Sequence, residues 1–418
     1  MARIPSVKEV DLKGKKVLIR IDHNVVKKGK IKDTYRIDAS LPTIKFVLKK
    51  GGKPILMSHV GRPKNKNTGE IIVSEATSVK PIVEYLNKKI GKTFKVALND
   101  KPDFKDKTAI EKLKEGEIDG VYLPNTRWFA GEEAKDEKAE GFAKELADLA
   151  DVFVNDAFGS WQPHASTFLV TKYLPSFAGL LMIKEIDNLA KVLDAKRPFV
   201  AVVAGSKFDT KIGPLTALLT KADHLIIGGV IYNAYLCAKY DIRIEGISEE
   251  DIQSAQSFID STREFSHKIL EIPLVLESDI LEKNDHGKTR IRKIADFQPG
   301  MKLNYILDAA PQAFETEEIK KIFADAETFF VNAVMGFTPN FSAGSKALYS
   351  LINENRKANK LFGGGDTLQD FKLLLPQIHS AALDDDKYYF FTGGGTILKA
   401  IQEGTAFGLE PVKALIEK

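Results

Sequence analysis

Short apolar runs alternate with helical patterns along almost the whole chain, and this alternation constrains the fold most. In the first half, strands are predicted at Lys16–Ile21, Pro54–Met57, Thr93–Leu98, Val121–Leu123 and Val152–Val154, separated by stretches with the apolar spacing of amphipathic helices. The second half repeats the alternation, with strands predicted at Phe199–Ala204, Leu225–Ile227, Tyr305–Leu307, Thr328–Val331, Lys360–Phe362 and Tyr388–Phe391. Near-continuous apolar strands between helices are typical of parallel sheets covered on both faces. The sequence therefore predicts an α/β protein.

The region between the two series of strands has a helical pattern of its own, at Leu180–Leu193. The length of 418 residues predicts two or three domains, at roughly 150 residues each. No Gly/Ser linker, low-complexity tract or short-period repeat interrupts the chain. We therefore expect residues 180–193 to form a helix that connects two α/β domains.

The cysteine content and the apolar stretches indicate the compartment. Cys237 is the one cysteine, so an internal disulfide and a thiolate metal cluster are excluded. The first residues lack the apolar core of a signal peptide. The longest apolar stretch, Leu225–Ala238, is interrupted by Asn233 and is shorter than the ~20 residues that span a bilayer. We expect a cytoplasmic protein without a membrane partner.

The charge is distributed unevenly along the chain. The first 100 residues hold 23 Lys and Arg against 9 Asp and Glu, whereas the remainder holds 38 against 48. A basic first part favours an anionic partner, although most of these lysines are expected simply to form a solvated surface. Nucleic acid is a second interpretation, but no zinc-finger spacing, recognition-helix pattern or aromatic RNA-binding motif supports it. We therefore expect no nucleic-acid partner.

Polar and cationic residues follow the predicted strands of the first half. They are Asp22, His23 and Asn24, then His59 and Arg62, then Asn125 and Arg127, then Asn155 and Asp156, with Arg36 before the first helix and His164 further on. In open α/β sheets the ligand crevice lies beyond the carboxyl ends of the strands. The planar guanidinium of arginine suits carboxylate and phosphate groups. A single arginine of this kind is explained equally well by a helix cap or by a surface ion pair. Three of them at separate strand ends favour a site for a small, multiply anionic molecule.

The corresponding positions of the second half are rich in glycine. The clusters are Gly205-Ser206-Lys207, Gly228-Gly229, Gly363-Gly364-Gly365 and Gly393-Gly394-Gly395, and each precedes a predicted helix. Glycine lets the backbone approach a ligand, and the free N–H groups of a helix start favour phosphate. Lys207 and Lys211 lie four residues apart and share a face of the expected helix. Asp366, beside a glycine run, is a candidate Mg²⁺ ligand, because Mg²⁺ is usually held by one or two carboxylates and phosphate oxygens.

Neither common nucleotide fingerprint is present. The chain has no G-x-x-x-x-G-K-[ST] and no complete G-x-G-x-x-G, which excludes a Walker-A protein and disfavours a dinucleotide dehydrogenase. The residues alone thus predict one half-site for an anionic metabolite and one for nucleotide phosphates. Phosphoryl transfer is the simplest chemistry that joins them.

Seven segments carry a specific resemblance. Ser58-His59-Val60-Gly61-Arg62-Pro63 resembles S-H-L-G-R-P, the most specific of them. The others are Arg20–Val25 (R-V-D-F-N-V-P), Asp33–Ile37 (D-D-T-R-I) continued by Ala39–Ile44, Asn125–Trp128 with Gly131–Glu133 (N-L-R-F-x-x-G-E-E), Asn155–Gly159 (N-D-A-F-G), Gly205–Lys207 with Lys211-Ile212 (G-A-K-V-S-D-K-I) and Gly363–Thr367 (G-G-G-D-T). In this order and over essentially the whole chain, they resemble the phosphoglycerate kinase family, of which this chain would be a divergent member.

This resemblance implies a fold and an activity. The fold is two Rossmann-like, doubly wound parallel-sheet domains: residues 1–178 for 3-phosphoglycerate, with a tail of about 405–418 packed back on them, and residues 194–404 for the nucleotide. Residues 179–193 form the connecting helix, about which the domains close. The activity is reversible phosphoryl transfer between 1,3-bisphosphoglycerate and Mg-ADP, giving 3-phosphoglycerate and Mg-ATP. The implied protein is a monomeric, glycolytic kinase whose partners are these small molecules, with Mg²⁺ as cofactor.

The resemblance also implies roles for individual residues. Substrate-binding residues would be Asp22, His23, Asn24, Arg36, His59, Val60, Gly61, Arg62, Arg127 and His164. Nucleotide-binding residues would be Gly205, Lys207, Lys211, Gly228, Asp308, Asn332, Gly364, Gly365, Asp366 and Thr367, with Asp366 on the metal. Arg36, Lys207, Gly365 and Gly395 would be catalytic. Lys207 would steady the transferring phosphoryl group, largely by charge neutralisation.

Several positions depart from the family pattern. Ser160-Trp161-Gln162-Pro163-His164 lacks the arginine of H-R-A-H, and Pro339 stands where W-N-G-P-x-G-V-F-E has the glutamate for the ribose. D-I-G-P becomes Asp308-Ala309-Ala310-Pro311, Val230 replaces a third glycine, and His23 replaces an aromatic residue as an expected packing change. An alternative is a member with decayed activity that binds a metabolite or a partner. Retention of Arg36, Lys207 and Asp366 favours an active kinase.

Overall fold

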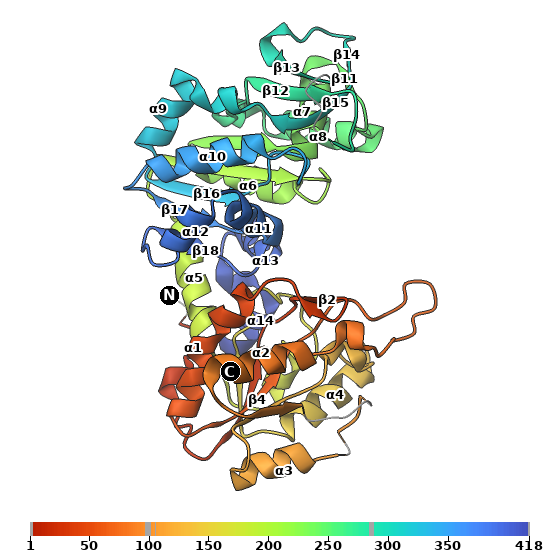
Figure 1. The fold of residues 1–418 in the computed structure, drawn as a ribbon, viewed down its shortest axis with the longest axis vertical. Coiled ribbons are helices and arrows are strands. Elements are labelled where there is room, and N and C mark those ends of the chain that lie inside the picture. Colours follow the sequence, from red (N-terminus) through yellow and green to blue (C-terminus); the bar gives the residue numbers. More distant parts are fainter. Residues whose placement is uncertain (1–2, 97–101, 105, 284–287, 417–418) are drawn as a thin grey trace. The chain divides into compact units, whose positions relative to one another are not determined.

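The computed structural model describes residues 3–96, 102–104, 106–283 and 288–416. Its contacts divide the chain into two compact units: unit 1 comprises residues 1–187 and 406–418, and unit 2 comprises residues 188–405. The division falls inside helix α5 (Leu180–Leu193), which has the bounds predicted from its apolar pattern. Figure 1 labels many of the elements of each unit.

Unit 1 is built on a six-stranded sheet in which every pair is parallel. The order is β5 (Phe94–Val96), β6 (Gly120–Tyr122), β4 (Lys53–Met57), β1 (Lys16–Arg20), β7 (Val152–Asn155) and β8 (Ser176–Ala178). The last four residues of β1 are buried, as expected for a central strand covered on both faces. Four of the five strands predicted in this half are therefore confirmed. β5 confirms part of the fifth, Thr93–Leu98, of which residues 97 and 98 lie outside the described residues. The carboxyl ends of these parallel strands lie at one edge.

Among the described residues, unit 1 also contains five α-helices besides α5. They are α1 (Tyr35–Lys49), α2 (Lys80–Ile90), α3 (Thr108–Glu115), α4 (Glu137–Ala147) and α14 (Glu410–Ile416), and a short hairpin of β2 (Val26–Lys27) and β3 (Lys30–Ile31) precedes α1. Local sequence explains the ends of α2, because Pro81 lies in its first turn and Gly91 ends it in the left-handed conformation. Helix α14 contacts β8, although more than 200 residues separate them in the sequence.

Unit 2 contains a five-stranded parallel sheet. Its order is β10 (His224–Gly228), β9 (Phe199–Gly205), β16 (Thr328–Asn332), β17 (Asn359–Phe362) and β18 (Tyr388–Phe390). In chain order this is 2-1-3-4-5, so the winding reverses between β9 and β16. Such a switch point is where open α/β sheets bind ligands. The helices are α6 (Ile212–Lys221), α7 (Gly229–Tyr240), α8 (Glu249–Ser261), α9 (Glu317–Asp325), α10 (Ala343–Glu354), α11 (Gly365–Leu374), α12 (Pro376–Ala382) and α13 (Gly394–Glu403).

One predicted strand of unit 2 has different partners from those expected. Tyr305–Leu307 lies in β15 (Tyr305–Ala309), which pairs antiparallel with β12 (Leu274–Ser278) and not with the parallel sheet. Strand β13 (Thr289–Lys293) completes this three-stranded sheet, and β11 (Arg243–Ile244) pairs with β14 (Lys302–Leu303) in a separate ribbon. The last four residues of β15 are buried. Burial explains its apolar run, but a run of apolar residues carries no information about the direction of the partner strand.

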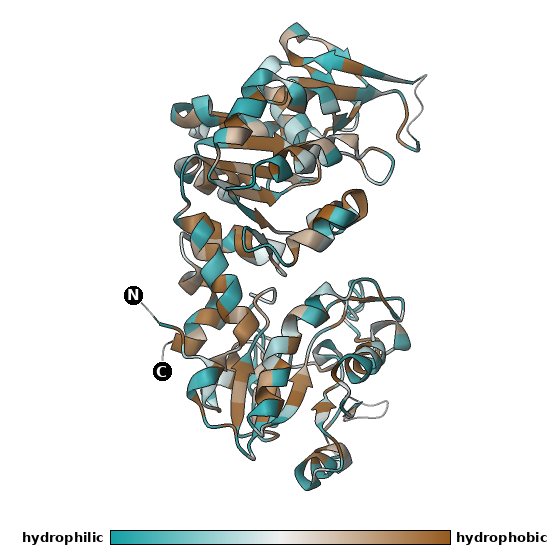
Figure 2. Ribbon diagram, turned by 60° about the vertical axis from the view of Figure 1, so that its left-hand side comes forward, coloured by the Kyte–Doolittle hydropathy of each residue, from teal (hydrophilic) through white to brown (hydrophobic). Residues whose placement is uncertain are grey.

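The hydrophobic cores lie around the central strands of each unit. Figure 2 shows hydrophobic residues along these strands and hydrophilic residues on the outer helices. In unit 1 the core joins strand residues such as Ile19 and Val154 with Ile44 and Val47 of α1. Across the parts of the chain that the structure describes, no helix is both long and apolar enough to cross a membrane.

Candidate active site

The carboxyl edge of the unit 1 sheet brings several predicted residues together around the backbone of Val60 and Gly61. The side chain of Asn125 accepts from the Val60 N–H at 3.0 Å and donates to the Val60 carbonyl at 2.7 Å. Asn24 Oδ1 accepts from the Gly61 N–H at 2.8 Å, and Arg127 Nη1 donates to the Gly61 carbonyl at 2.7 Å. The loops after β1, β4 and β6 are thereby fastened to one another, and the Arg127 side chain is held at the Gly61 carbonyl.

Arg36 lies in the first turn of α1 and forms an ion pair with Asp22. Its Nη1 is 3.3 Å from Asp22 Oδ2, and the Asp22 side chain is buried. Burial alone would raise the pKa of Asp22, but the charges of Arg36 and Arg20 and the hydrogen bond from the Asn24 N–H outweigh burial and hold the pKa below its ordinary value. Asp22 is therefore a carboxylate at neutral pH, and it holds the guanidinium of Arg36 at the end of β1.

His59 is a neutral ring with a defined tautomer. Burial, aided by Arg20 and Arg127, keeps its pKa well below the ordinary value. Arg20 Nη2 lies 3.0 Å from His59 Nδ1. Because a guanidinium has donors only, Nδ1 must accept, so the ring hydrogen is on Nε2. His59 thus offers one N–H donor and no charge to a ligand.

Arg20 is a residue of the site that the reasoning from strand ends missed. It is fully buried at the end of β1, and its Nε donates to Ser166 Oγ at 2.9 Å. Ser166 Oγ in turn donates to Glu132 Oε1 at 2.7 Å, which connects the buried arginine to a buried carboxylate. The available signal was a cation inside an apolar strand, because a buried charge requires a partner.

Three other predicted residues of unit 1 differ in their exposure. The His23 side chain is buried, with Nδ1 3.0 Å from the Tyr122 hydroxyl and Nε2 2.8 Å from Ser40 Oγ, so its ring is not available to a ligand. Arg62 is exposed. His164 Nε2 lies 4.0 Å from Glu133 Oε1, which is also 2.8 Å from Arg127 Nε. Burial lowers the pKa of His164, with Glu132 and Glu133 opposing and Arg127 and Arg20 adding to the shift.

In unit 2 the glycine-rich segments connect strand ends to helix starts. Helices α7, α11 and α13 begin within their glycine runs, at Gly229, Gly365 and Gly394. The first N–H groups of a helix lack partners within it, so these starts present donors at the edge of the sheet. Gly365 and Gly395 are exposed there.

Two of these glycines are required by close packing. Gly364 has a φ of 103°, and a Cβ atom on it would lie 2.9 Å from Asn332 Nδ2. A Cβ atom on Gly394 would lie 2.5 Å from the Cα atom of Gly364. The loops after β17 and β18 therefore touch at their backbones, which no side chain would allow.

The switch point of the unit 2 sheet is flanked by Lys211 and Asn332. Lys211 Nζ donates to Asn332 Oδ1 at 3.4 Å, and Asn332 Nδ2 donates to the Gly363 carbonyl at 2.8 Å. Burial lowers the pKa of Lys211. Gly205 ends β9 and Gly228 ends β10. Lys207 is exposed, and the prediction that it shares a helix face with Lys211 is wrong, because α6 begins only at Ile212. The structure thus brings a lysine, an amide and a glycine loop together at the expected crevice.

Asp308, Asp366 and Thr367 have different surroundings. Asp308 is buried and accepts from the N–H groups of Gly344 and Ala309, both at 2.9 Å. Burial raises its pKa to about 7, with a further contribution from Asp370. The carboxyl group is therefore engaged at the start of α10. Asp366 is exposed in the first turn of α11, and Thr367 beside it is buried.

The residues that the structure describes contain no group of three or more His, Cys, Asp or Glu side chains that would hold a metal ion by themselves. A single exposed carboxylate, such as that of Asp366, is the kind of ligand that suits Mg²⁺ when phosphate oxygens complete its shell. The donor set thus fits a metal that arrives with a nucleotide.

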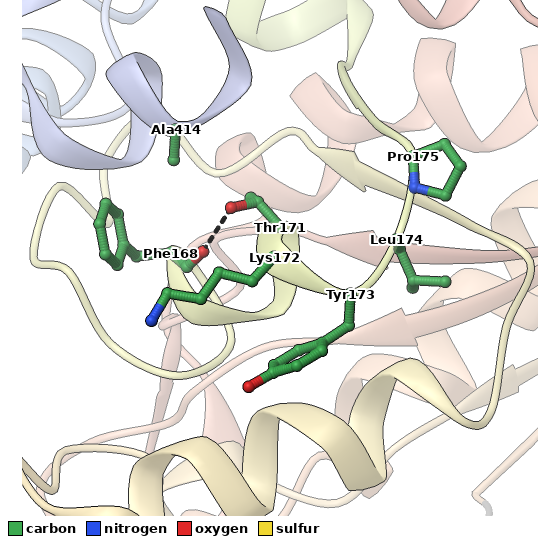
Figure 3. Close-up of a pocket in the computed structure, with 7 residues that line it drawn as sticks. All are labelled: Phe168, Thr171, Lys172, Tyr173, Leu174, Pro175 and Ala414. Carbon is green, nitrogen blue, oxygen red and sulfur yellow. Dashed lines mark hydrogen bonds between the residues drawn. The ribbon is translucent and has the colours of Figure 1, made fainter. Parts of the chain in front are cut away.

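A pocket of about 510 Å³ lies elsewhere in unit 1. Figure 3 shows its lining, which is Phe168, Thr171, Lys172, Tyr173, Leu174, Pro175 and Ala414. None of the predicted site residues lines it. Lys172 and the Tyr173 hydroxyl both contact Glu140, so its polar groups are already paired.

The comparisons with known proteins agree with this geometry. A family model described as phosphoglycerate kinase matches residues 7–404. The chain belongs to the phosphoglycerate kinase family. This confirms the resemblance drawn from the motifs.

Individual family members match over almost their whole length. A phosphoglycerate kinase of Dictyoglomus turgidum is 35% identical over 410 residues, which cover 96% of each chain. The structure of phosphoglycerate kinase from Coxiella burnetii superposes with a TM-score of 0.76 at 29% identity, covering 99% of both chains. That of phosphoglycerate kinase from Pyrococcus horikoshii has a TM-score of 0.78 at 21% identity, covering 99% of this chain and 100% of the other, and shows the shared fold. The predicted fold class, two doubly wound α/β domains, is therefore confirmed.

Proposed function

We propose that the chain is an active phosphoglycerate kinase, which transfers a phosphoryl group reversibly between 1,3-bisphosphoglycerate and Mg-ADP to give 3-phosphoglycerate and Mg-ATP. The observation that carries the proposal is the cluster of donors from three loops around Val60 and Gly61, in a chain that matches the family over residues 7–404. A decayed binding protein has no need of the exposed Lys207 or of the open glycine helix starts.

Unit 1 supplies the site for 3-phosphoglycerate. Arg36, Arg62 and Arg127 neutralise the phosphate and carboxylate groups, and His59 and His164 add ring donors. Asp22 and Asn24 orient the hydroxyl side of the substrate, while the backbone of Val60 and Gly61 holds the loop. His23 supports the site from the interior of unit 1 and does not contact the substrate, since its ring is buried and bonded on both nitrogens. Arginine suits this role because its fork binds oxyanions with paired, charge-assisted hydrogen bonds.

Unit 2 supplies the site for the nucleotide. Gly205, Gly228, Gly364 and Gly365 let phosphates approach the backbone, Lys211 and Asn332 flank the switch point, and Asp366 and Thr367 lie in the first turn of α11. Lys207, with the helix starts at Gly365 and Gly395, stabilises the charge on the transferring phosphoryl group. Little covalent work falls to the protein, so catalysis consists of positioning and charge neutralisation.

Mg²⁺ completes the proposed nucleotide site, with Asp366 as its protein ligand. When bound with a nucleotide, it supplies charge neutralisation of the phosphate oxygens. The side chain of Asp308 stays outside this role, because its carboxyl oxygens are bonded to the start of α10. Asp308 instead shapes the wall beside the nucleoside.

The proposal includes a division of labour along the chain. Residues 1–178 with the tail from about 405 bind the metabolite, residues 194–404 bind the nucleotide, and residues 179–193 connect them. The reaction needs both ligands in one water-excluded place, so the two domains close during the cycle. We further propose that the protein acts as a cytoplasmic monomer.

A coupled assay tests the activity. The purified chain should phosphorylate 3-phosphoglycerate with ATP and Mg²⁺, and should release no ADP when 3-phosphoglycerate is omitted. Calorimetry on the same preparation should detect binding of each ligand. Folded protein that binds 3-phosphoglycerate but gives no turnover would support the decayed alternative and refute the proposal.

A further inference from the structure

His23 is a predicted substrate residue whose buried ring cannot reach a ligand, and it is held by a continuous chain of hydrogen bonds. Its Nε2 lies 2.8 Å from Ser40 Oγ, its Nδ1 lies 3.0 Å from the Tyr122 hydroxyl, and its backbone N–H donates to Ser58 Oγ at 2.9 Å. His23 follows β1, Ser58 follows β4 and Tyr122 ends β6, whereas Ser40 belongs to α1. His23 therefore joins the ends of β1, β4 and β6 to α1, and its ring supplies the contacts to Tyr122 and Ser40.

The direction of each hydrogen bond follows from the donors available. Ser40 Oγ donates its one hydrogen to the Ile37 carbonyl at 2.9 Å, so it must accept from His23 Nε2. His23 Nδ1 then carries a lone pair and accepts from Tyr122. Burial raises the pKa of Tyr122, which keeps its hydroxyl protonated, and burial lowers the pKa of His23 to about 3, which keeps the ring neutral. Both groups stay in these states throughout the physiological range.

Helix α1, whose Ser40 accepts the hydrogen bond from His23, also carries Arg36. Arg36 and Ser40 are four residues apart on α1 and so lie on the same face, one turn from each other. The N-cap residue of α1, Thr34, makes no side-chain capping hydrogen bond. The first turn is held instead by Asp33 Oδ1, which accepts from the Tyr35 N–H at 2.8 Å, and by the ion pair of Arg36 with Asp22. The hydrogen bond of Ser40 with His23 holds the next turn and ties α1 to the strand ends of the site.

We propose that His23 is a positioning residue, which holds the first turns of α1 against the strand ends through Ser40 and thereby fixes Arg36 for phosphoryl transfer. An aromatic ring at this position would fill the space but would leave Ser40 without its donor. This inference rests on the proposed role of Arg36. A displacement of about 1 Å at a catalytic group is enough to cost up to about a hundredfold in rate.

The test compares His23→Phe and Ser40→Ala, which break the same hydrogen bond from its two ends. Each should lower kcat for 3-phosphoglycerate phosphorylation about tenfold with little change in KM for ATP. The double variant should be no more than about twofold worse than either single variant, because both remove one interaction. Ser40→Ala keeps the test valid if His23→Phe fails to fold.

The Arg36→Ala background distinguishes positioning from general loosening. In that background Ser40→Ala should change kcat by less than about twofold, since the group it positions is gone. Ile44→Val is the matched control: it lies one turn further along α1 in the core, so it should lower stability while leaving kcat and KM unchanged.

Two results would overturn the inference. Wild-type kinetics in both Ser40→Ala and His23→Phe would show that the chain of hydrogen bonds is structural only. An equal loss of kcat from Ser40→Ala with and without Arg36, or the same loss in Ile44→Val, would show that these substitutions loosen α1 in general and do not act through Arg36. Wild-type kinetics in the single variant Arg36→Ala would refute the proposed role of Arg36, and the inference with it. A loss of activity in Arg36→Ala together with either of the first two results would refute only the positioning role of His23.

Discussion

At the scale of single residues, the arginines and lysines proposed to bind the ligands differ in how far the fold depends on their contacts. Arg127 is bonded to Gly61 and paired with Glu133, and Arg36 is paired with Asp22. Lys207 and Arg62 are exposed, and within the described residues neither side chain makes a hydrogen bond or ion pair. Substitution of these two therefore tests function with little effect on stability.

Lys207→Ala is expected to lower kcat far more than it raises either KM. Its charge is proposed to act on the transferring phosphoryl group, and loss of one such contact costs roughly 3–4 kcal/mol, or about 10²–10³ in kcat. Steady-state kinetics measure the change. Lys196→Ala is the control, an exposed lysine of the same unit outside the site. An unchanged kcat in Lys207→Ala would remove this lysine from the mechanism.

Arg62→Ala should weaken 3-phosphoglycerate binding and leave nucleotide binding nearly intact. The reason is its place after β4 in unit 1, whereas the nucleotide residues belong to unit 2. Calorimetry with each ligand separately measures both affinities, and Arg127→Ala should act in the same direction. A parallel fall in nucleotide affinity would contradict the assignment of two half-sites.

At the scale of elements, the start of α5 is capped by a buried acid. Asp156 Oδ1 accepts from the N–H groups of Leu181 at 2.9 Å and Met182 at 3.2 Å, and Thr43 Oγ1 accepts from Leu180 at 3.0 Å. A Cβ atom on Gly179 would lie 2.1 Å from Asp156 Oδ1, so this position requires glycine. Burial raises the pKa of Asp156 to about 6, because the carboxylate loses its hydration.

Asp156 should make unit 1 less stable as the pH rises from about 4 to about 6. The folded chain holds this proton up to about pH 6, whereas an unfolded aspartate releases it near pH 4, so the unfolded state gains relative to the folded state between them. Asp156→Asn does not titrate. Its free energy of unfolding minus that of the wild type should rise by about 2–3 kcal/mol between pH 4 and pH 7 in urea titrations. A difference that stays constant with pH would contradict the raised pKa.

The loop between β16 and α10 determines the expected nucleotide preference. Pro339 offers no carboxylate to the ribose, and Asp308 is bonded to the start of α10. A site that does not bond a hydroxyl cannot reject an analogue that lacks it. We therefore expect kcat/KM for ATP, GTP and 2′-deoxy-ATP to agree within about tenfold, or ~1.4 kcal/mol. At saturating 3-phosphoglycerate, a preference for ATP beyond a hundredfold would show that another group reads the nucleoside, with Asn332 the first to examine.

At the scale of the whole molecule, the chain leaves unit 1 through α5 and returns to it after unit 2. Val412 and Leu415 of the returning helix α14, and Leu409 just before it, are each at most 3% exposed, and α14 contacts β8 at the edge of the sheet. Residues 409–415 therefore contribute to the core of the first unit.

Leu415→Ala should destabilise unit 1 by about 2–5 kcal/mol, because a buried leucine is replaced by a cavity. Calorimetry should show a lower melting temperature for the transition of unit 1, which 3-phosphoglycerate should raise again. Leu383→Ala is the control, since Leu383 is 53% exposed in unit 2. An unchanged transition in Leu415→Ala would contradict the role of α14 in this core.

The positions of the helices and strands, and the chemical character of the residues at their ends, could be predicted from local sequence. The strands at Lys16–Ile21, Phe199–Ala204 and Lys360–Phe362 were predictable because central parallel strands are apolar on both faces. The glycine runs were predictable as helix starts because glycine permits backbone conformations and contacts that side chains forbid, as Gly364 and Gly394 show. These properties are local, so neighbouring residues encode them.

Which residues become hydrogen-bond or strand-pairing partners follows from the folded structure and not from local sequence. Arg20 and Ser166 are 146 positions apart, and His23 and Tyr122 are 99 apart, so no pattern along the chain reveals their hydrogen bonds. The same reason explains why Tyr305–Leu307 was assigned to the parallel sheet: its apolar side chains indicated burial, but its antiparallel partner β12 lies elsewhere in the sequence. Burial is encoded residue by residue, whereas the direction of a strand pair and the tautomer of a buried histidine depend on groups that folding brings together.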